Sequence, residues 1–192
     1  MFTGLPKTLL VNGREEPIRY EYTAVLDAIS AMNDPDLDDS ERVYACLYII
    51  YVNFDQFTPD DYKPAFDAAS EFINNGESTE DDGRYHPKLI DFEQDYKLLI
   101  PAVNKVAGME IREREDIHWW TFMSWFMEIG ESTYATVLSI RSKKNHGKKL
   151  EKWEQEFYRD NKNIVDIHRK VSEAEKARVQ EIERRLIQML DG

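Results

Sequence analysis

Three aspartates spaced two residues apart, Asp34, Asp36 and Asp38, resemble the start of a calcium-binding loop, in which alternating oxygen ligands coordinate the ion. Such a loop also needs a glycine at its sixth position and a bidentate acid at its twelfth. Here Asp39 and Ala45 stand at those two positions. The spacing therefore favours an acidic loop whose negative charge stabilises the N-terminus of the helix that follows.

Other residues that could perform chemistry are present but scattered. The sequence has four histidines and one cysteine, none at spacings typical of a metal site: His86, His118, His146, His168 and Cys46. It contains no G-x-S-x-G, H-E-x-x-H or G-x-G-x-x-G motif, and Gly147-Lys148-Lys149 lacks the rest of a phosphate-binding loop. We therefore expect a protein that is not an enzyme and needs no metal, nucleotide or other cofactor. A hydrolase or transferase using a carboxylate pair is the weaker alternative, because no motif supplies nucleophile, base and anion stabiliser together.

The most aromatic stretch of the chain covers residues 118–126. Four of its side chains form one helical stripe: Trp119, Phe122, Met123 and Phe126. This pattern predicts a central core helix in which Trp119 and Phe122 are buried, since each aromatic ring removes about 150–250 Å² from water. Trp120 and Trp125 fall off the stripe, so the alternative is that these two line a hydrophobic patch for a partner.

Basic residues concentrate towards the C-terminal end. Residues 1–140 carry 11 basic and 27 acidic groups, whereas residues 141–192 carry 14 and 10. Five of the basic residues lie close together: Arg141, Lys143, Lys144, Lys148 and Lys149. We interpret residues 142–149 as a solvated basic loop. The alternative is that Arg141, Lys143 and Lys144 dock onto an acidic surface, for which the N-terminal half of the chain is itself a candidate.

The elements that must position these residues are mostly helices. Leu9, Leu10 and Val11 run into Asn12-Gly13, a strong signal for a two-residue hairpin turn, and Ile18, Tyr20 and Tyr22 alternate on the predicted return strand. Capping-box pairs at Asp38 with Glu41 and at Asp91 with Gln94, a closing glycine at 108 and 3.6-residue stripes predict successive helices. They cover residues 25–32, 38–53, 58–75, 91–108, 117–129, 132–141 and 150–157. The fold class expected is mainly α, a multi-helix domain with a short N-terminal β-hairpin and a long C-terminal helix.

Four regions follow from this pattern. Residues 1–75 hold the hairpin and the first helices. Residues 76–90 form an acidic linker, which has almost no apolar side chain over 76–88. Residues 91–163 form the aromatic-rich helical region, and residues 164–192 form the C-terminal helix.

The C-terminal helix carries two successive apolar seams. The first consists of Ile164, Ile167, Val171 and Ala174, and the second of Val179, Ile182, Leu186 and Met189. The second seam starts one residue late, which rotates it away from the first. A helix over 164–190 would be about 40 Å long, so we expect the second seam to project from the domain. It would be available for self-association or for a helical partner, unless it is only a frayed end.

Charge and hydropathy restrict the classes of partner. A net charge of −12 disfavours a dominant nucleic-acid-binding role, because a protein this acidic repels phosphate at long range. The longest apolar run, residues 43–52, is about half a membrane span, and no basic and apolar secretory leader is visible. One cysteine forms no internal disulfide and fits a reducing compartment. We therefore expect an intracellular protein that binds neither nucleic acid nor membrane.

Several short strings resemble the bacteriophage gene-product-fifteen family of long-tailed phages. They are Asp91-Phe92-Glu93-Gln94-Asp95-Tyr96, His118-Trp119-Trp120 with Phe122, Gly130-Glu131-Ser132-Thr133, Ile140-Arg141-Ser142-Lys143-Lys144, and Glu156-Phe157-Tyr158-Arg159 with Asn161. The resemblance covers about residues 5–170, in order, and leaves residues 171–192 unmatched.

This resemblance implies a tail-assembly chaperone. Such a protein binds the phage tape-measure protein and helps to recruit tail-tube subunits around it. It acts in the cytoplasm of the infected bacterium, is absent from the mature virion and has no catalytic or metal site. The alternative is a structural tail-completion component that is retained in the virion.

Overall fold

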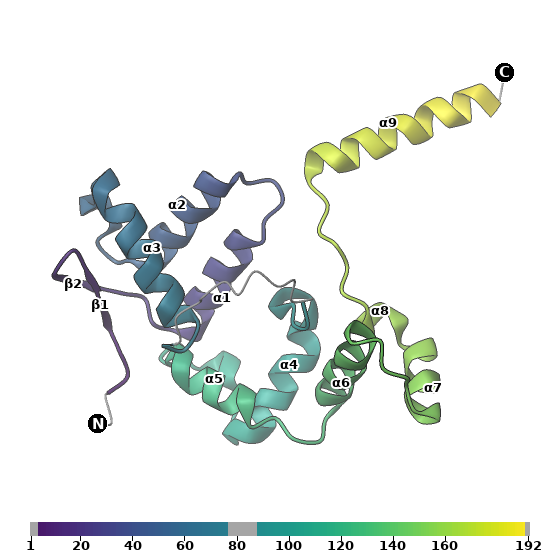
Figure 1. Cartoon of the computed structure of the whole chain (residues 1–192), viewed down its shortest axis with the longest axis horizontal. Coiled ribbons are helices and arrows are strands. Elements are labelled where there is room, and N and C mark those ends of the chain that lie inside the picture. The colour runs from purple at the N-terminus through teal and green to yellow at the C-terminus, as the bar shows by residue number, and fades with distance from the viewer. Residues whose placement is uncertain (1–3, 77–87, 191–192) are drawn as a thin grey trace.

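The computed structural model describes residues 4–76 and 88–190, and the side chains of the last helix through Ile182 together with Arg184. Figure 1 shows a mainly helical chain with a two-stranded hairpin at its N-terminal end. The elements are β1 (Thr8–Val11), β2 (Arg14–Pro17), α1 (Tyr22–Met32), α2 (Asp39–Ile50), η1 (Phe54–Gln56), α3 (Pro59–Ile73), α4 (Phe92–Ala107), η2 (Ile111–Glu113), α5 (Trp119–Met127), α6 (Thr133–Asn145), α7 (Lys152–Asp160), α8 (Lys162–Val165) and α9 (Glu173–Leu190). The predicted fold class is confirmed, although α9, at 18 residues, is of moderate length.

The hairpin forms where the Asn-Gly pair predicts it. Asn12 and Gly13 both have positive φ, 49° and 80°, as this tight turn requires, and Val11 pairs with Arg14 across it. The return strand is shorter than predicted, because β2 ends at Pro17 and Tyr22 already begins α1. The backbone between them pairs instead with the end of α2, through the Arg19 N–H and the Ile50 carbonyl at 2.8 Å, and with the start of α5, through the Trp119 N–H and the Tyr20 carbonyl at 2.7 Å.

Helices α1, α2 and α3 pack against one another in the N-terminal part. The predicted capping box of α2 is present, with the Asp38 carboxylate accepting from the Glu41 N–H at 2.9 Å. This helix ends at Ile50, three residues before the predicted end. There the Arg19 guanidinium donates to the carbonyls of Tyr48, Ile49 and Tyr51, which stabilises the helix terminus.

Asp61 fastens the hairpin to the first turn of α3. Its carboxylate accepts hydrogen bonds from the Thr58 N–H and hydroxyl, the Asn12 amide and the Arg14 guanidinium, at 2.8–3.0 Å. These donors, led by the Thr58 N–H, hold the pKa of Asp61 far below the usual range of an aspartate. The ionised carboxylate is therefore favoured in the folded protein.

This arrangement predicts a pH dependence of stability. The folded protein keeps Asp61 ionised below pH 4, whereas an unfolded aspartate takes up a proton near its ordinary pKa of about 3.9. The stabilisation is therefore complete above about pH 4 and is lost progressively on further acidification. Urea unfolding should show the wild type to be more stable than Asp61→Asn at pH 6, with the difference shrinking below pH 4. A difference that stays constant down to pH 2 would contradict the assignment.

The predicted Asp91 cap of α4 forms, but Gln94, the predicted capping-box partner of Asp91, binds another part of the chain. Asp91 accepts from the N–H groups of Glu93 and Gln94, at 3.2 and 3.0 Å. The Gln94 side chain does not return to Asp91 and instead binds the backbone of residues 166 and 168. The Asp95 carboxylate takes the Asp91 N–H in its place, at 3.1 Å.

One apolar core contains buried residues from Val11 to Tyr134 and so joins the N-terminal helices to α4 and α5. Trp119 and Phe122 belong to it, at 1% and 0% exposed, which confirms the core prediction for both. A second, smaller cluster consists of Val137, Ile140 and Val165, with side chains of α7 packed against it. The predicted acidic linker, residues 76–90, lies outside the described residues except at 76 and 88–90.

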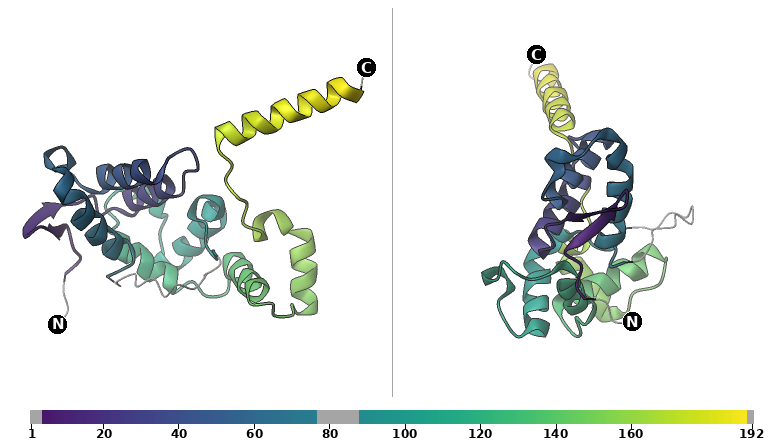
Figure 2. Two further views of the ribbon diagram at one scale, coloured as in Figure 1. Left: turned by 45° about the horizontal axis from the view of Figure 1, so that its top comes forward. Right: turned by 90° about the vertical axis from the view of Figure 1, so that its left-hand side faces the viewer.

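The prediction of one continuous C-terminal helix from Ile164 is wrong. Helix α8 ends at Val165, residues 166–172 run without helical structure, and α9 begins at Glu173. We call residues 166–172 the strap. The Arg141 guanidinium binds the carbonyls of Ile164 and Val165, which a continuing helix would need for the amides four residues further on. Figures 1 and 2 show α9 extending from the end of the strap, away from the other helices.

Among the helices that the structure describes, none is both long and apolar enough to cross a membrane.

Candidate partner-binding surfaces

The three aspartates that resemble a calcium loop act as helix caps and turn residues. Asp38 caps α2 as the acidic-loop interpretation requires, and the Asp34 carboxylate accepts the Asp36 N–H at 2.9 Å. The Asp36 carboxylate accepts the N–H of Glu173 at 2.8 Å and so binds the start of α9 from a distant part of the chain. In the described residues, no group of three or more His, Cys, Asp or Glu side chains is arranged to hold a metal ion.

His118 positions the aromatic helix α5. Its Nδ1 accepts the Trp120 N–H at 3.0 Å, and its Nε2 lies 2.7 Å from the carbonyl oxygen of Pro6. Since a carbonyl can only accept, the Nε2 carries the proton and the ring is neutral in this arrangement. Burial lowers the pKa of His118, which is consistent with a neutral cap.

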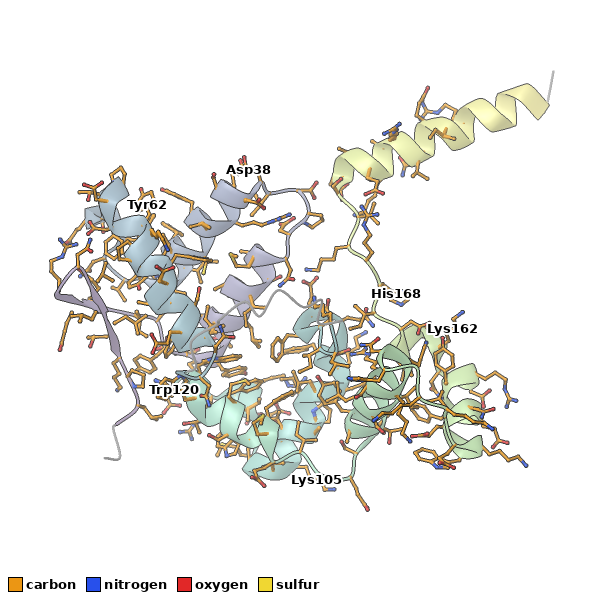
Figure 3. The ribbon with its side chains drawn as sticks, in the orientation of Figure 1. Asp38, Tyr62, Lys105, Trp120, Lys162 and His168 are labelled. Atoms are coloured by element: carbon orange, nitrogen blue, oxygen red, sulfur yellow. The ribbon has the colours of Figure 1, made fainter. Side chains whose placement is uncertain are left out.

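The two tryptophans that fall off the stripe are only partly exposed. Trp120 lies where the end of α3 meets the start of α5 (Figure 3). Its indole N–H donates to the carbonyl of Phe72 at 2.9 Å, and its ring stacks on that of Phe72. A β-carbon on Gly76, which has a φ of +86°, would lie 3.5 Å from the same ring. Trp120 thus closes the C-terminal end of α3, while Trp125 packs against the core. Partner binding by these two residues stays a prediction.

Arg141 is buried, not part of an exposed basic loop. Helix α6 continues to Asn145, so the predicted loop over 142–149 is wrong for its first half. The Arg141 side chain is 4% exposed and forms two parallel hydrogen bonds to the Asp95 carboxylate, at 2.7 and 2.8 Å. It also donates to the carbonyls of Leu89, Ile164 and Val165. Its partner is therefore internal, which corrects the prediction that Arg141 contacts another protein.

Lys143 and Lys144 also form internal ion pairs. The Lys143 ammonium binds the Glu154 carboxylate at 2.6 and 2.7 Å and lowers the pKa of that carboxyl. The Lys144 ammonium pairs with Asp166 of the strap and lies 3.7 Å from the centre of the Tyr158 ring. Both lysines are about one-third exposed and tie α6 to α7 and the strap. Their carboxylate partners belong to the C-terminal part of the chain and not to the acidic N-terminal half. Partner binding by Lys143 and Lys144 stays a prediction.

A groove of about 650 Å³ lies between α1 and α4. We call it the α1–α4 groove. Its apolar lining consists of Tyr22, Leu26, Ile29, Ile90, Phe92 and Tyr96, and three lysines also line it, Lys88, Lys97 and Lys170. Lys170 belongs to the strap and pairs with Glu93 of α4, so the strap bounds one part of the groove. The arrangement suits the apolar ridge of an extended or helical partner.

The family of this chain follows from its match to a known protein family. The sequence pattern of the family described as Bacteriophage Gp15 protein matches residues 2–167. This chain belongs to the Bacteriophage Gp15 protein family. No match was found among the curated proteins or among the solved structures that were searched.

The Gp15 match ends inside the strap, so α9 lies beyond it. On α9, Val179 and Ile182 of the predicted second seam are 48% and 49% exposed, as an unpaired seam requires. The Leu186 side chain lies outside the described residues. The first seam is interrupted by the strap, so Ile167 and Val171 do not continue a helical face.

Two features of this Gp15-family protein are not among the sequence-based predictions: the burial of Arg141 and the α1–α4 groove. Arg141 lies four residues after buried Val137 and directly after buried Ile140, so its place on the apolar side of α6 was the available signal. The α1–α4 groove had no such signal, because it depends on how two helices far apart in sequence are placed.

Proposed function

We propose that this protein is a tail-assembly chaperone that binds the phage tape-measure protein and helps to recruit tail-tube subunits. In this proposal it is a binding protein rather than an enzyme. It acts in the cytoplasm of the infected bacterium and leaves before the virion is complete. Membership of the Gp15 family supports a phage function.

The α1–α4 groove is the observation that carries the proposal. Tyr96 in this groove is 37% exposed, and apolar side chains from both helices line it. A tape-measure protein that is largely helical presents apolar ridges at intervals of three and four residues, which such a groove accommodates. The exposed seam at Val179 and Ile182 offers a second apolar contact on α9.

Blocking the groove is expected to weaken capture of the tape-measure protein. Thr23 is exposed and lines the groove, so Thr23→Arg places a bulky cation there without removing a core side chain. Together with Tyr96→Ala, it should weaken co-purification of co-expressed tape-measure protein at least tenfold, the size expected when a central contact is lost.

Two further proteins sharpen this experiment. Trp153→Ala removes an exposed aromatic side chain that does not line the groove, and its capture should match the wild type. Truncation after Ala177 removes most of α9 and measures how much this helix contributes to capture of the tape-measure protein. Unchanged capture in the groove variant, with the truncated protein inactive, would move the binding site to α9. Unchanged capture in both would refute the proposed function at these surfaces.

Mass spectrometry of purified particles tests whether the protein leaves before the virion is complete. A chaperone that leaves should be missing from the virion. Its presence at constant copy number would instead identify a structural component, such as a tail-completion protein.

A further inference from the structure

A cluster of aromatic rings gathers on α2, η1 and the start of α3, away from the residues that line the α1–α4 groove. The rings surround Phe54 and belong to Tyr44, Tyr48, Tyr51, Phe54, Phe57 and Tyr62. Phe54 is 6% exposed, whereas Tyr44 and Tyr48 are 52% and 63% exposed. We call Tyr44, Tyr48 and Tyr62, with Phe54 beneath them, the tyrosine platform.

The platform is held in place by packing. Tyr44 and Tyr48 lie one turn apart on α2, and both meet Phe54 in nearly perpendicular contacts with centroid distances of 4.9 and 6.2 Å. Tyr62, on α3, contacts both Phe54 and Tyr44. Because α2 and α3 are joined through this ring cluster, a partner would meet a preorganised surface and would order few side chains on binding.

The polar ends of the platform are available. In the described part of the chain, the hydroxyls of Tyr44, Tyr48 and Tyr62 form no hydrogen bond. Each hydroxyl can both donate and accept. Tyrosine combines a large apolar ring with such a polar end, which is why it is enriched at protein interfaces and among residues that dominate binding energy.

The charge around the platform is negative. Three exposed acidic residues lie on the elements that carry the platform, Glu41, Asp55 and Asp60, whereas Asp61 is buried and paired with Arg14. The neighbouring cations are already engaged. Lys63 pairs with Asp67, Arg19 binds the carbonyls at the end of α2, and Arg42 binds the carbonyl of Asp34 and the Asp39 carboxylate. Glu41 precedes Tyr44 by three residues and so lies on the same side of α2. A cation brought to the platform therefore meets both carboxylates and aromatic rings, which attract it.

We propose that the tyrosine platform is a docking site for a basic amphipathic segment of a partner protein. Apolar side chains of that segment would cover the rings, and its lysines or arginines would lie over the tyrosines and near Glu41, Asp55 and Asp60. Because the platform shares no residue with the α1–α4 groove, both surfaces can be occupied at once. The inference thus goes beyond the proposed function and stands without it.

The full-length protein can be tested with synthetic peptides. The probe is an 18-residue amphipathic peptide of leucine and lysine, and the comparison peptide has glutamate in place of lysine. Titration by isothermal calorimetry should show binding of the basic peptide only. Tyr44→Ala with Tyr48→Ala should weaken this binding at least tenfold, as expected for loss of two anchoring tyrosines.

Matched variants separate docking from general attraction to an acidic protein. Trp153→Ala removes an exposed aromatic side chain that belongs to neither the platform nor the groove and should leave binding unchanged. Asp55→Asn with Asp60→Asn should weaken it and reduce its dependence on salt. Thermal melting checks that each variant is folded. Equal binding of both peptides, or no effect of the Tyr44 and Tyr48 substitutions in folded protein, would overturn the proposal. So would light scattering that showed the platform tyrosines to hold two copies of this chain together.

Discussion

Arg141→Ala is expected to lower the free energy of unfolding by about 3–5 kcal/mol, because removing one member of a buried ion pair leaves the other charge uncompensated. Asp95 is 1% exposed and would lose both of its bonds to the guanidinium. Three backbone carbonyls would lose a donor as well. For a chain of this size the melting midpoint should fall by about 6–20 °C.

Two comparisons isolate the buried charge as the cause. Arg114→Ala breaks an exposed pair with Asp116 and should leave the midpoint nearly unchanged. Replacing both partners, Arg141→Met with Asp95→Leu, should cost less than Arg141→Ala alone, because no buried charge then remains unpaired. If the double variant were the less stable of the two, the bonds to the carbonyls would be the main contribution instead.

Trp119→Ala is expected to destabilise the protein by a similar amount, about 3–5 kcal/mol, through loss of apolar contact and the cavity that remains. The Trp119 indole stacks on Phe122 at 5.5 Å, meets Phe92 edge-on, and donates its N–H to the carbonyl of Ile73 at 2.9 Å. The loss should appear as a lower midpoint in urea or as insoluble protein.

The exposed Trp153, at 56%, provides the matched control. Trp153→Ala removes the same side chain from a solvated position and should change stability little. Trp119→Phe should fall between the wild type and Trp119→Ala, because it keeps a ring but loses the indole hydrogen bond. Near-normal unfolding of Trp119→Ala would show that α5 contributes little to the core.

Local patterns predicted most of the fold. The Asn12-Gly13 turn, the caps at Asp38 and Asp91 and the glycine at 108 act within a few residues of themselves, so their effect is visible in the sequence. The apolar stripe through Trp119 and Phe122 likewise predicted burial. The helix class and the hairpin followed from such short-range rules.

What failed depends on contacts between distant residues. The strap interrupts a helical pattern because Arg141 and Gln94 bind its backbone and the carbonyls before it, and neither residue is near in sequence. Arg141 itself was predicted to be available for docking because it belongs to a cluster of basic residues. Its position directly after Ile140, on the apolar side of α6, indicates burial instead. The stretch at 43–53 was predicted only as an apolar helix, and its exposed tyrosines were not recognised as a surface.

The distance in sequence between Asp95 and Arg141 also sets an order for folding during synthesis. The two residues are 46 positions apart, which a ribosome covers in about 2–9 s at 5–20 residues per second. Until Arg141 has been synthesised, the Asp95 carboxylate has no guanidinium partner. Burying it without that partner is unfavourable, so the N-terminal end of α4 is expected to stay solvated. The junction of α4 with α6, α8 and the strap is completed last, after the carbonyls of Ile164 and Val165 have been made.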